Sequence, residues 1–410
     1  MNKVIIIGAG AAGLLAGIAA VNNGAQVVIL EKMPKVGRKL LITGKGRCNI
    51  TNDCTIQELV KNIPGNGKFL YSAFQHFPQT SLIQLLNSNG LATKVERGNR
   101  VFPVSDKAMD VVDTLRRCLL KSGGEIYTQC PVEKIITSGS IVREVICSKG
   151  RSFQGDAFVL TTGGASYVGT GSSGDGYRFA EELGHTLVPL RPSLIPLVCP
   201  LEEIQGLQGL SLKNVTAALE INGKIKGKEF GEMLFTHFGV SGPIILSLSE
   251  FIKEGAQQKL HLDLKPALSL DELDKRVQRD FKLYSRKQLL NGMQDLLPQS
   301  LIPAIIKAAG LNPKVEINQL TKEQRISLVH TLKDYTLTIT GARPLAEAIV
   351  TAGGISLKEV QPKTMASKLF PNLFLAGEVL DINGYTGGFN LQAAFSSGFV
   401  AGESAAAYHE

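Results

Sequence analysis

Three glycines near the start of the sequence have the spacing that a dinucleotide-binding turn requires. Gly8, Gly10 and Gly13 form a Gly-x-Gly-x-x-Gly pattern directly after the apolar run Lys3–Ile7. The first glycine permits a tight turn, the second lets the backbone approach a pyrophosphate, and the third lets the following helix pack on the strand. The pattern therefore predicts a bound dinucleotide.

An acidic residue completes this pattern. Glu31 directly follows a second apolar run, Val27–Leu30, and a carboxylate in this position can accept hydrogen bonds from both hydroxyls of an adenosine ribose. Between the two runs, the small residues 11–23 predict a helix, whose first amide groups, at Ala11 and Ala12, would face the diphosphate. The result is a βαβ unit, and these residues alone do not separate NAD from FAD.

A segment rich in glycine and cations comes next. Gly37–Asn52 contains two further glycines after Gly37, in a run that also holds Thr, Lys and Arg. Positive charge this close to a dinucleotide-binding turn favours a bound diphosphate and an anionic flavin over a nucleic-acid surface. The cations lie within sixteen residues that contain no acid: Lys32, Lys35, Arg38, Lys39, Lys45 and Arg47.

The glycines of this segment are Gly37, Gly44 and Gly46. This segment, the block before it and two later blocks together resemble a known protein family. The sequence resembles the bacterial flavoproteins known as NAD(FAD)-utilizing dehydrogenases, distant relatives of the fumarate reductase and succinate dehydrogenase flavoproteins. That family includes bile-acid-inducible enzymes that reduce unsaturated 3-oxo bile acids. The resemblance implies non-covalently bound FAD, and it spans nearly the whole chain in four blocks: Gly8–Glu31, Gly37–Asn52, Thr161–Gly184 and Leu373–Gly402.

The resemblance implies a place on FAD for each block. Arg38 and Lys39 would lie near the phosphates or the ribityl chain, and the loop at 43–49 would follow the edge of the isoalloxazine ring. Val132 would pair its backbone with the adenine, and Glu378 would accept hydrogen bonds from the ribityl hydroxyls. Motif and resemblance together predict these cofactor-binding residues: Gly8, Gly10, Ala11, Ala12, Gly13, Glu31, Lys32, Arg38, Lys39, Thr43, Gly44, Arg47, Asn49, Val132, Thr162, Gly163, Gly377, Glu378, Gly388, Asn390 and Leu391.

Two adjacent glycines lie near the C-terminus. Gly387 and Gly388 would open a helix whose first amide groups, at Asn390 and Leu391, stabilise negative charge on the flavin ring. The loop around Arg47 would supply positive charge to the same ring. These two segments are therefore expected to meet, although about 340 residues separate them.

No residue stands out as the catalytic group. His237 is a polar residue in the mainly apolar stretch Met233–Pro243 and could face the flavin, but a hydrogen-bonded histidine at a domain interface fits the pattern equally well. Tyr385 could donate a proton, and Arg47 could supply charge. The histidines and cysteines show no metal-ligand spacing, so no metal is predicted, and Cys48 is expected to be a packed residue because it has no CxxC partner.

Composition limits the kinds of protein that this chain can be. The net charge of +8 lies in residues 1–120, with 15 Lys or Arg against 7 Asp or Glu. Tryptophan is absent and aromatic residues make up 6%, which argues against a base-stacking surface for nucleic acid. Six cysteines without paired spacing, and no cleavable export signal, predict reduced thiols in a cytoplasmic protein. Val4–Val21 has no charge, but its order of strand, glycine turn and small-residue helix argues against a membrane span.

The predicted fold class is α/β, with a Rossmann-like FAD-binding domain interrupted by an insert made of a small β-barrel and a helical subdomain. The FAD-binding domain is expected at 1–191 and 352–410. The insert is expected to place its barrel at 192–268 and 334–351 and its helices at 269–333. The clearest helical periods are 56–62, 79–89, 106–122 (beginning at Asp106), 270–283 and 323–332.

The leading hypothesis is an FAD-dependent oxidoreductase that takes electrons from NAD(P)H and reduces an enone, another electron-poor double bond or a carbonyl. Because only one dinucleotide fingerprint is complete, NAD(P)H would visit the flavin transiently. One alternative is an oxidase or dehydrogenase of an amine or a hydroxy compound. Another is a flavin-containing RNA-binding or RNA-modifying protein, against which the near-neutral insert argues. The expected partner is a small molecule, with no nucleic acid and no membrane, and the oligomeric state stays open.

Overall fold

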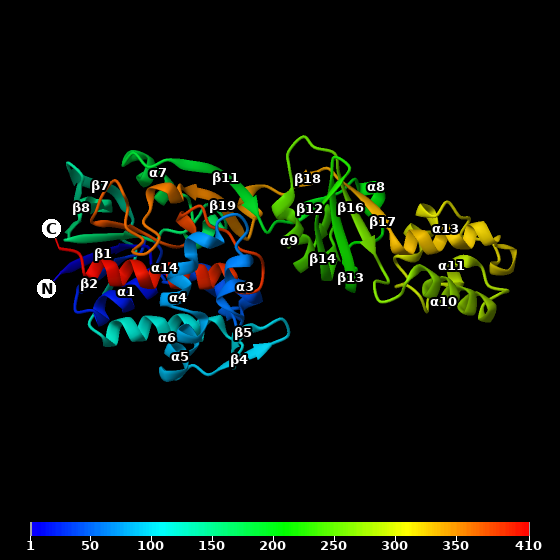
Figure 1. Ribbon diagram of the computed structural model, residues 1–410, viewed down its shortest axis with the longest axis horizontal. Coiled ribbons are helices and arrows are strands. Elements are labelled where there is room, and N and C mark those ends of the chain that lie inside the picture. Colours follow the sequence, from blue (N-terminus) through cyan, green and yellow to red (C-terminus); the bar gives the residue numbers. More distant parts are fainter. Residues whose placement is uncertain (1, 410) are drawn as a thin grey trace. The chain divides into compact units, whose positions relative to one another are not determined.

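The computed structural model describes residues 2–409, and the chain divides into two compact units (Figure 1). The first unit runs to Ser193 and resumes at Leu345, and the second is Leu194–Pro344. The second unit is therefore an insert in the first. The fold class is the predicted one, a Rossmann-like α/β domain interrupted by an insert.

A five-stranded parallel sheet forms the centre of the first unit. Its strand order is β20-β10-β1-β2-β6, and every pairing is parallel. Apart from their first residues, the middle strands are apolar, as a sheet covered on both faces requires. The strands are β1 (Lys3–Ile7), β2 (Gln26–Leu30), β6 (Glu125–Tyr127), β10 (Ala157–Leu160) and β20 (Leu373–Leu375).

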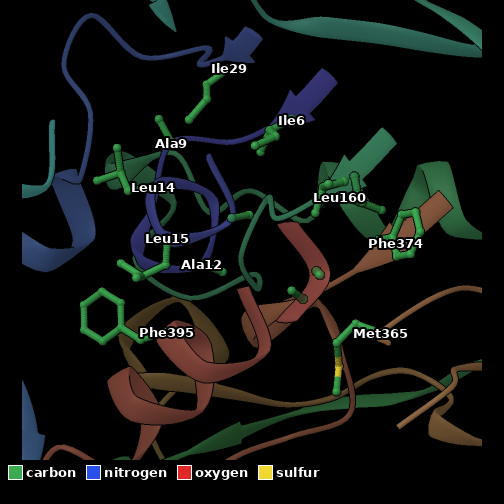
Figure 2. Close-up of a cluster of buried hydrophobic side chains, with 14 of the residues drawn as sticks. Ile6, Ala9, Ala12, Leu14, Leu15, Ile29, Leu160, Met365, Phe374 and Phe395 are labelled. Atoms are coloured by element: carbon green, nitrogen blue, oxygen red, sulfur yellow. The ribbon is translucent and has the colours of Figure 1, made fainter. Parts of the chain in front are cut away.

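Two helices from opposite ends of the chain pack together on this sheet. They are α1 (Ala11–Asn22) and α14 (Phe389–Ala406), which lie side by side in Figure 1. Glycines allow the close approach, because a Cβ added at Gly398 would lie 2.2 Å from the Ala12 carbonyl oxygen. Figure 2 shows side chains of the core around them, including these: Ile6, Leu14, Leu15, Ile29, Leu160, Phe374 and Phe395.

Three smaller antiparallel sheets complete the first unit. Their orders are β3-β5-β4, β7-β8-β9 and β11-β19. The strands are β3 (Thr51–Asn52), β4 (Thr93–Glu96), β5 (Arg100–Pro103), β7 (Val132–Ser138), β8 (Ile141–Cys147), β9 (Ser152–Gln154), β11 (Leu187–Ser193) and β19 (Val350–Ile355). The helices are α2 (Arg38–Ile42), α3 (Ile56–Lys61), α4 (Tyr71–His76), α5 (Gln79–Ser88), α6 (Ala108–Lys121) and α7 (Asp175–Glu182).

The second unit is built on a seven-stranded antiparallel sheet of order β17-β16-β13-β14-β15-β12-β18. The two strands at the ends of this order are separated in sequence by Thr340 alone, so the sheet must curl until its ends approach each other, as in a barrel. The strands are β12 (Leu197–Val198), β13 (Ser211–Ile221), β14 (Lys224–Phe235), β15 (Gly239–Ser241), β16 (Gln258–Asp263), β17 (Tyr335–Ile339) and β18 (Gly341–Ala342).

Helices make up the rest of the second unit. The short α8 (Leu201–Ile204) and α9 (Pro243–Leu248) accompany the sheet, and four further helices fill the segment between β16 and β17. The longest of them, α10 and α13, each begin at a capping box, Ser269 with Glu272 and Thr321 with Gln324. The four helices are α10 (Leu270–Leu283), α11 (Leu289–Gly292), α12 (Ile302–Ala308) and α13 (Lys322–Lys333).

Two details differ from the sequence analysis. Helix α6 begins at Ala108 and not at Asp106, because Asp106 has a φ of 55° and its carboxylate bonds Arg47 and Lys94. The first unit resumes at Leu345, before the predicted position 352, because β19 pairs with β11. Among residues 2–409, no helix combines the length and apolarity that crossing a membrane requires.

Candidate functional site

The glycine-rich turn after β1 has the geometry that each glycine predicts. Gly8 has a φ of 105°, and a Cβ there would lie 2.6 Å from the Thr161 carbonyl oxygen. At Gly13 an added Cβ would lie 1.9 Å from the Gly8 carbonyl oxygen, so only glycine lets α1 start this close to β1. An added Cβ at Gly10 has no neighbour within 4 Å. The turn is therefore closed by Gly8 and Gly13 and open at Gly10.

Glu31 ties this turn to the end of β2. One carboxylate oxygen accepts a hydrogen bond from the Ala9 amide at 2.8 Å, and the other accepts one from the Met33 amide at 2.8 Å. Burial raises the pKa of Glu31, and these two hydrogen bonds offset part of that rise. The Cys130 amide donates to the Glu31 carbonyl oxygen at 2.9 Å, which brings the segment before Val132 beside the acid. The structure thus brings together residues that the sequence analysis expected at the adenosine end of FAD.

Lys39 and Glu378 form an ion pair across 339 positions of sequence, at 2.6 Å. Helix α2 brings Lys39 here, since the Gly37 amide before it donates to the Ala9 carbonyl oxygen at 2.9 Å. The other Glu378 oxygen accepts from the Thr351 amide at 2.8 Å. Glu378 is therefore held by side chain and backbone before any ligand binds.

The end of β10 brings further predicted residues to the same edge of the sheet. The Thr162 hydroxyl oxygen is buried and has no hydrogen-bond partner among residues 2–409, and it packs against Gly176, where an added Cβ would lie 2.0 Å from it. Gly163 has a φ of 75° and packs against Ser172. Lys32 is paired with Asp175 at the start of α7, at 2.5 Å, and also contacts Ser173.

Arg47 has a different environment from the one that its sequence position suggests. Its guanidinium pairs with Glu96 and with Asp106, the latter at 2.7 Å, and lies 4.1 Å from the centre of the Phe102 ring. Lys94 pairs with Asp106 at 2.6 Å. Two cations and two carboxylates thus neutralise one another on this surface, which we call the Arg47 corner (Arg47, Lys94, Glu96, Asp106).

The loop before the Arg47 corner is tightly wound. Gly44, Lys45 and Cys48 have positive φ angles of 56°, 60° and 61°. The Thr43 hydroxyl donates to the Leu40 carbonyl oxygen at 2.7 Å. Cys48 is fully buried, and burial raises the pKa of its thiol to about 11, so it is the packed residue that the sequence predicted.

The two segments that were expected to meet do meet, at the junction of β3 with α14. The Asn52 side-chain amide donates to the Gly387 carbonyl oxygen at 3.0 Å. The Asn49 amide oxygen accepts from the Gly388 amide at 3.1 Å when its nitrogen faces the carbonyl oxygens of Thr51 and Val101. Contact is close enough to need a glycine, because a Cβ at Gly388 would lie 2.4 Å from the Thr51 backbone.

A buried polar network holds the first two turns of α14 against β3. The fully buried Thr51 hydroxyl donates to the Gln392 side-chain oxygen at 2.5 Å, and Gln392 donates to the Ser396 hydroxyl at 2.8 Å. Ser396 in turn donates to the Phe77 carbonyl oxygen at 2.7 Å. The first hydrogen bond within α14 runs from the Gln392 amide to the Gly388 carbonyl oxygen, so the preceding amides of the first turn have no acceptor in the helix.

The remaining predicted residues have separate places. The Asn390 side chain folds back to bond Gly384 through both its oxygen and its nitrogen, each at 2.7 Å, while its backbone belongs to the first turn of α14 with that of Leu391. The Tyr385 amide donates to the Asn62 carbonyl oxygen at 2.9 Å. His237 is an exposed residue of the second unit, with its ring edge-on to Phe238. The catalytic roles considered for Tyr385 and His237 stay predictions.

Four residues of the site were missed by the sequence analysis: Ser166, Thr351, Asn52 and Gln392. Ser166 and Thr351 bond Glu378, and the other two bind β3 to α14. Gln392 had a visible signal, because it is a polar residue in a segment that otherwise consists mainly of small and apolar residues. Asn52 had no such signal, because its segment is rich in polar and charged residues. Ser166 and Thr351 had none, since their role depends on a partner far away in sequence.

Together these residues fit a bound FAD. The carboxyl ends of four parallel strands deliver Gly8, Glu31, Thr162 and Gly377 to one edge of the sheet, where ligands bind in such folds. The open space at Gly10 leaves room for a pyrophosphate. The unbonded first-turn amides of α14 can face the flavin ring.

Comparison with known proteins gives a match over almost the whole chain. The family described as HI0933-like protein Rossmann domain matches residues 2–404. The 3-dehydro-bile acid delta(4,6)-reductase of Clostridium scindens is 32% identical and the alignment covers 99% of both chains. The ribosomal RNA dihydrouridine synthase of Escherichia coli is 31% identical over 97% of this chain and 96% of that protein. The structure of 3-ketosteroid delta1-dehydrogenase from Sterolibacterium denitrificans shares the fold, with a TM-score of 0.56 and 15% identity over 99% of this chain and 100% of that one.

Proposed function

The chain belongs to the HI0933-like Rossmann-domain family and is an FAD-dependent oxidoreductase, and we propose that it reduces a carbon–carbon double bond conjugated with a carbonyl group. The observation that carries the proposal is the 32% identity to a bile acid reductase over 99% of both chains. The name of that relative describes reduction of double bonds conjugated with a 3-oxo group.

The second curated relative supports the same reaction class. A dihydrouridine synthase saturates the 5,6 double bond of uracil, which is conjugated with a ring carbonyl. The two relatives are 32% and 31% identical to this chain, yet one name describes a steroid and the other an RNA. What they share is the electron-poor double bond, and this shared chemistry is what we assign to the chain.

The residues of the first unit divide the work of holding the cofactor. When bound, FAD supplies a ring that accepts a hydride from a donor and passes it to an acceptor. The turn at Gly8–Gly13 would hold the diphosphate, Glu31 would accept hydrogen bonds from the ribose hydroxyls, and Lys39 and Glu378 would bind the phosphates or the ribityl chain. The first-turn amides of α14, which β3 holds in place, would donate hydrogen bonds to the flavin ring.

We propose NAD(P)H as the electron donor, binding transiently. Residues 169–174 form another Gly-x-Gly-x-x-Gly pattern. This pattern precedes α7, whose N-terminus already holds the Lys32–Asp175 pair. No parallel strand of the central sheet follows α7 directly, since the next strand, β11, pairs antiparallel with β19. That segment therefore lacks the βαβ unit of a resident NAD(P) site.

The alternative is an oxidase or dehydrogenase of an amine or a hydroxy compound, and one experiment separates the two. FAD-loaded protein is mixed without oxygen with NADH, with NADPH, and with a panel of amines and hydroxy compounds, while flavin absorbance is followed. Bleaching by a nicotinamide, followed by recovery on adding a 3-oxo-4-ene steroid, supports the proposal. Bleaching by an amine or alcohol but by neither nicotinamide contradicts it.

A further inference from the structure

The exposed face of α10, in the second unit, concentrates positive charge. Residues 275–287 contain six Lys or Arg and one Asp. Lys275, Arg279 and Lys282 follow the i, i+4, i+7 spacing that places them on one face of the helix, and Arg286 follows in the next turn of chain. The opposite face holds the buried residues of the helix: Leu273, Val277, Asp280 and Phe281.

The acid in this segment does not neutralise that face. Asp280 is buried and accepts two hydrogen bonds from the Arg276 Nε, at 2.7 and 3.0 Å, while the Arg279 Nε lies 3.6 Å away. The Arg279 side chain stays 70% exposed. Among the described residues, 2–409, neither Lys282 nor Arg286 forms an ion pair. Lys275 lies one helical turn after two exposed carboxylates, Asp271 and the capping Glu272.

The same face has a hollow and an uncovered apolar side chain. A depression of about 400 Å³ is lined by Arg279, Asp280, Lys282 and Leu283. Leu283 is 72% exposed, the largest exposure among the large apolar residues of the described chain. Leu283 is therefore an apolar side chain that lies among the exposed cations of this face.

Helix stability does not account for the arrangement. Cations in the last turn of a helix stabilise it through the macrodipole, which explains Lys282 but not Lys275. Helix α13 in the same unit shows how structural cations are treated, because Arg325 pairs with Asp274 at 2.8 Å and Lys333 with Asp263 at 2.6 Å. Among the described residues, Lys282 and Arg286 have no such carboxylate, and Arg279 has only the longer 3.6 Å contact with Asp280.

We propose that this face of α10 (Lys275, Arg279, Lys282, Leu283 and Arg286) binds the sugar–phosphate backbone of an RNA. A row of regularly spaced cations matches the regularly spaced phosphates of a polynucleotide, and the arginines can bond phosphate oxygens in pairs. Leu283 and the hollow offer an apolar surface to a ribose or a base. The relative named as a ribosomal RNA dihydrouridine synthase shows that RNA is a substrate within this family. The small net charge of the insert argued against nucleic acid in the sequence analysis. A net charge summed over the whole insert does not show, however, that cations gather on one face of α10.

The test compares two triple variants of the FAD-loaded protein. K275Q/R279Q/K282Q removes the charge from α10, and K224Q/K226Q/K228Q removes the same charge from exposed positions of β14. The probe is a short fluorescent hairpin RNA containing uridines, titrated over a salt series. The wild type is expected to bind with strong salt dependence, and the α10 variant is expected to lose about three from the slope of log K against log salt, at about one per phosphate contact. The β14 variant is expected to keep the wild-type slope.

Three outcomes would overturn the proposal. The first is no RNA binding by the wild type, and the second is an equal loss in both variants, which would indicate net charge alone. The third is binding of vesicles containing anionic lipid with the same dependence on α10, in the absence of RNA binding. Flavin bleaching by NAD(P)H and reduction of a steroid enone require no RNA, so these reactions, measured on the same preparations, report on the proposed function separately.

Discussion

The Arg47 corner and the junction of β3 with α14 were both expected to stabilise negative charge on the flavin ring, and they are built in opposite ways. The Arg47 corner consists of four charged and partly exposed side chains that neutralise one another. The junction contains no charged side chain, and its polar groups at Thr51, Gln392 and Ser396 are fully buried. The Arg47 corner has formal charges that balance one another. The junction has no formal charge, but the amides of the first turn of α14 all point in one direction.

The difference teaches that charge in a sequence is not the same as charge available to a ligand. Two cations beside two carboxylates produce a field that nearly cancels at the distance of a neighbouring ligand. The amides at the start of α14 are not cancelled in this way, because their dipoles are fixed by the helix. We therefore assign the control of the flavin to the junction.

The largest expected effect comes from Gly388→Ala. Gly388 has a φ of 99°, and a Cβ there would lie 2.4 Å from the Thr51 backbone, so the variant must open the junction. We expect it to lower the free energy of unfolding by about 3 kcal/mol or more and to lower the flavin content of the purified protein. Urea unfolding and flavin absorbance measure both. Gly169→Ala is the control, since a Cβ there has no neighbour within 4 Å, and an equal loss in that variant would contradict the role of the junction.

Gln392→Leu breaks the buried network without changing a charge. The Thr51 hydroxyl and the Phe77 carbonyl oxygen then lose a partner, and we expect the free energy of unfolding to fall by about 1–3 kcal/mol. Adding Thr51→Val removes the Thr51 hydroxyl, which Gln392→Leu leaves without an acceptor, and should recover part of the lost free energy of unfolding. Denaturation of the two single variants and the double variant gives the coupling energy. Strictly additive effects would mean that Thr51 and Gln392 do not act together.

Glu31→Ala tests whether the adenosine end is independent of the ring end. Loss of charge-assisted hydrogen bonds to the ribose should weaken FAD binding by about 1–3 kcal/mol. The midpoint potential of the bound flavin should not change, because Glu31 bonds Ala9 and Met33 and has no contact with the junction. Calorimetric titration of the apoprotein measures the affinity, with Glu31→Gln as the control of similar shape. Unchanged affinity in Glu31→Ala would remove Glu31 from the site.

Local pattern was enough to predict most of the first unit. The turn from Gly8 to Gly13, the helix after it and the acid at Glu31 all follow from spacing and hydrophobic order within thirty-one residues. The meeting of the segments around Asn49 and Gly388 was also predicted, from the resemblance. These features depend on backbone geometry, which short sequence patterns determine.

Partners of charged side chains could not be predicted in the same way. Nothing in the spacing of Arg47 indicates that Glu96 and Asp106 lie beside it, because β4 and the turn after β5 bring them there. The pairing of Lys39 with Glu378 depends on two strands and a helix that are distant in sequence. Residues such as Thr351 contribute a backbone amide, and no side-chain pattern reports that.

The smallest expected effect comes from neutralising the Arg47 corner in a balanced way. Arg47→Gln together with Glu96→Gln removes one positive and one negative charge that are in direct contact. We expect the flavin potential to change by less than about 10 mV, which is under about 0.5 kcal/mol for a two-electron couple. Glu96→Gln alone serves as the control, since an unbalanced change of charge should move the potential.

The central claim is that the uncharged junction, and not the Arg47 corner, sets the potential of the flavin. Anaerobic redox titration of the wild type, of Gln392→Leu and of Arg47→Gln/Glu96→Gln, all saturated with FAD, tests it directly. If the first-turn amides of α14 lose about 1–2 kcal/mol of their stabilising effect, the Gln392→Leu potential falls by roughly 20–45 mV while that of the double variant stays at the wild-type value. A potential that falls in the double variant and stays constant in Gln392→Leu would contradict the claim.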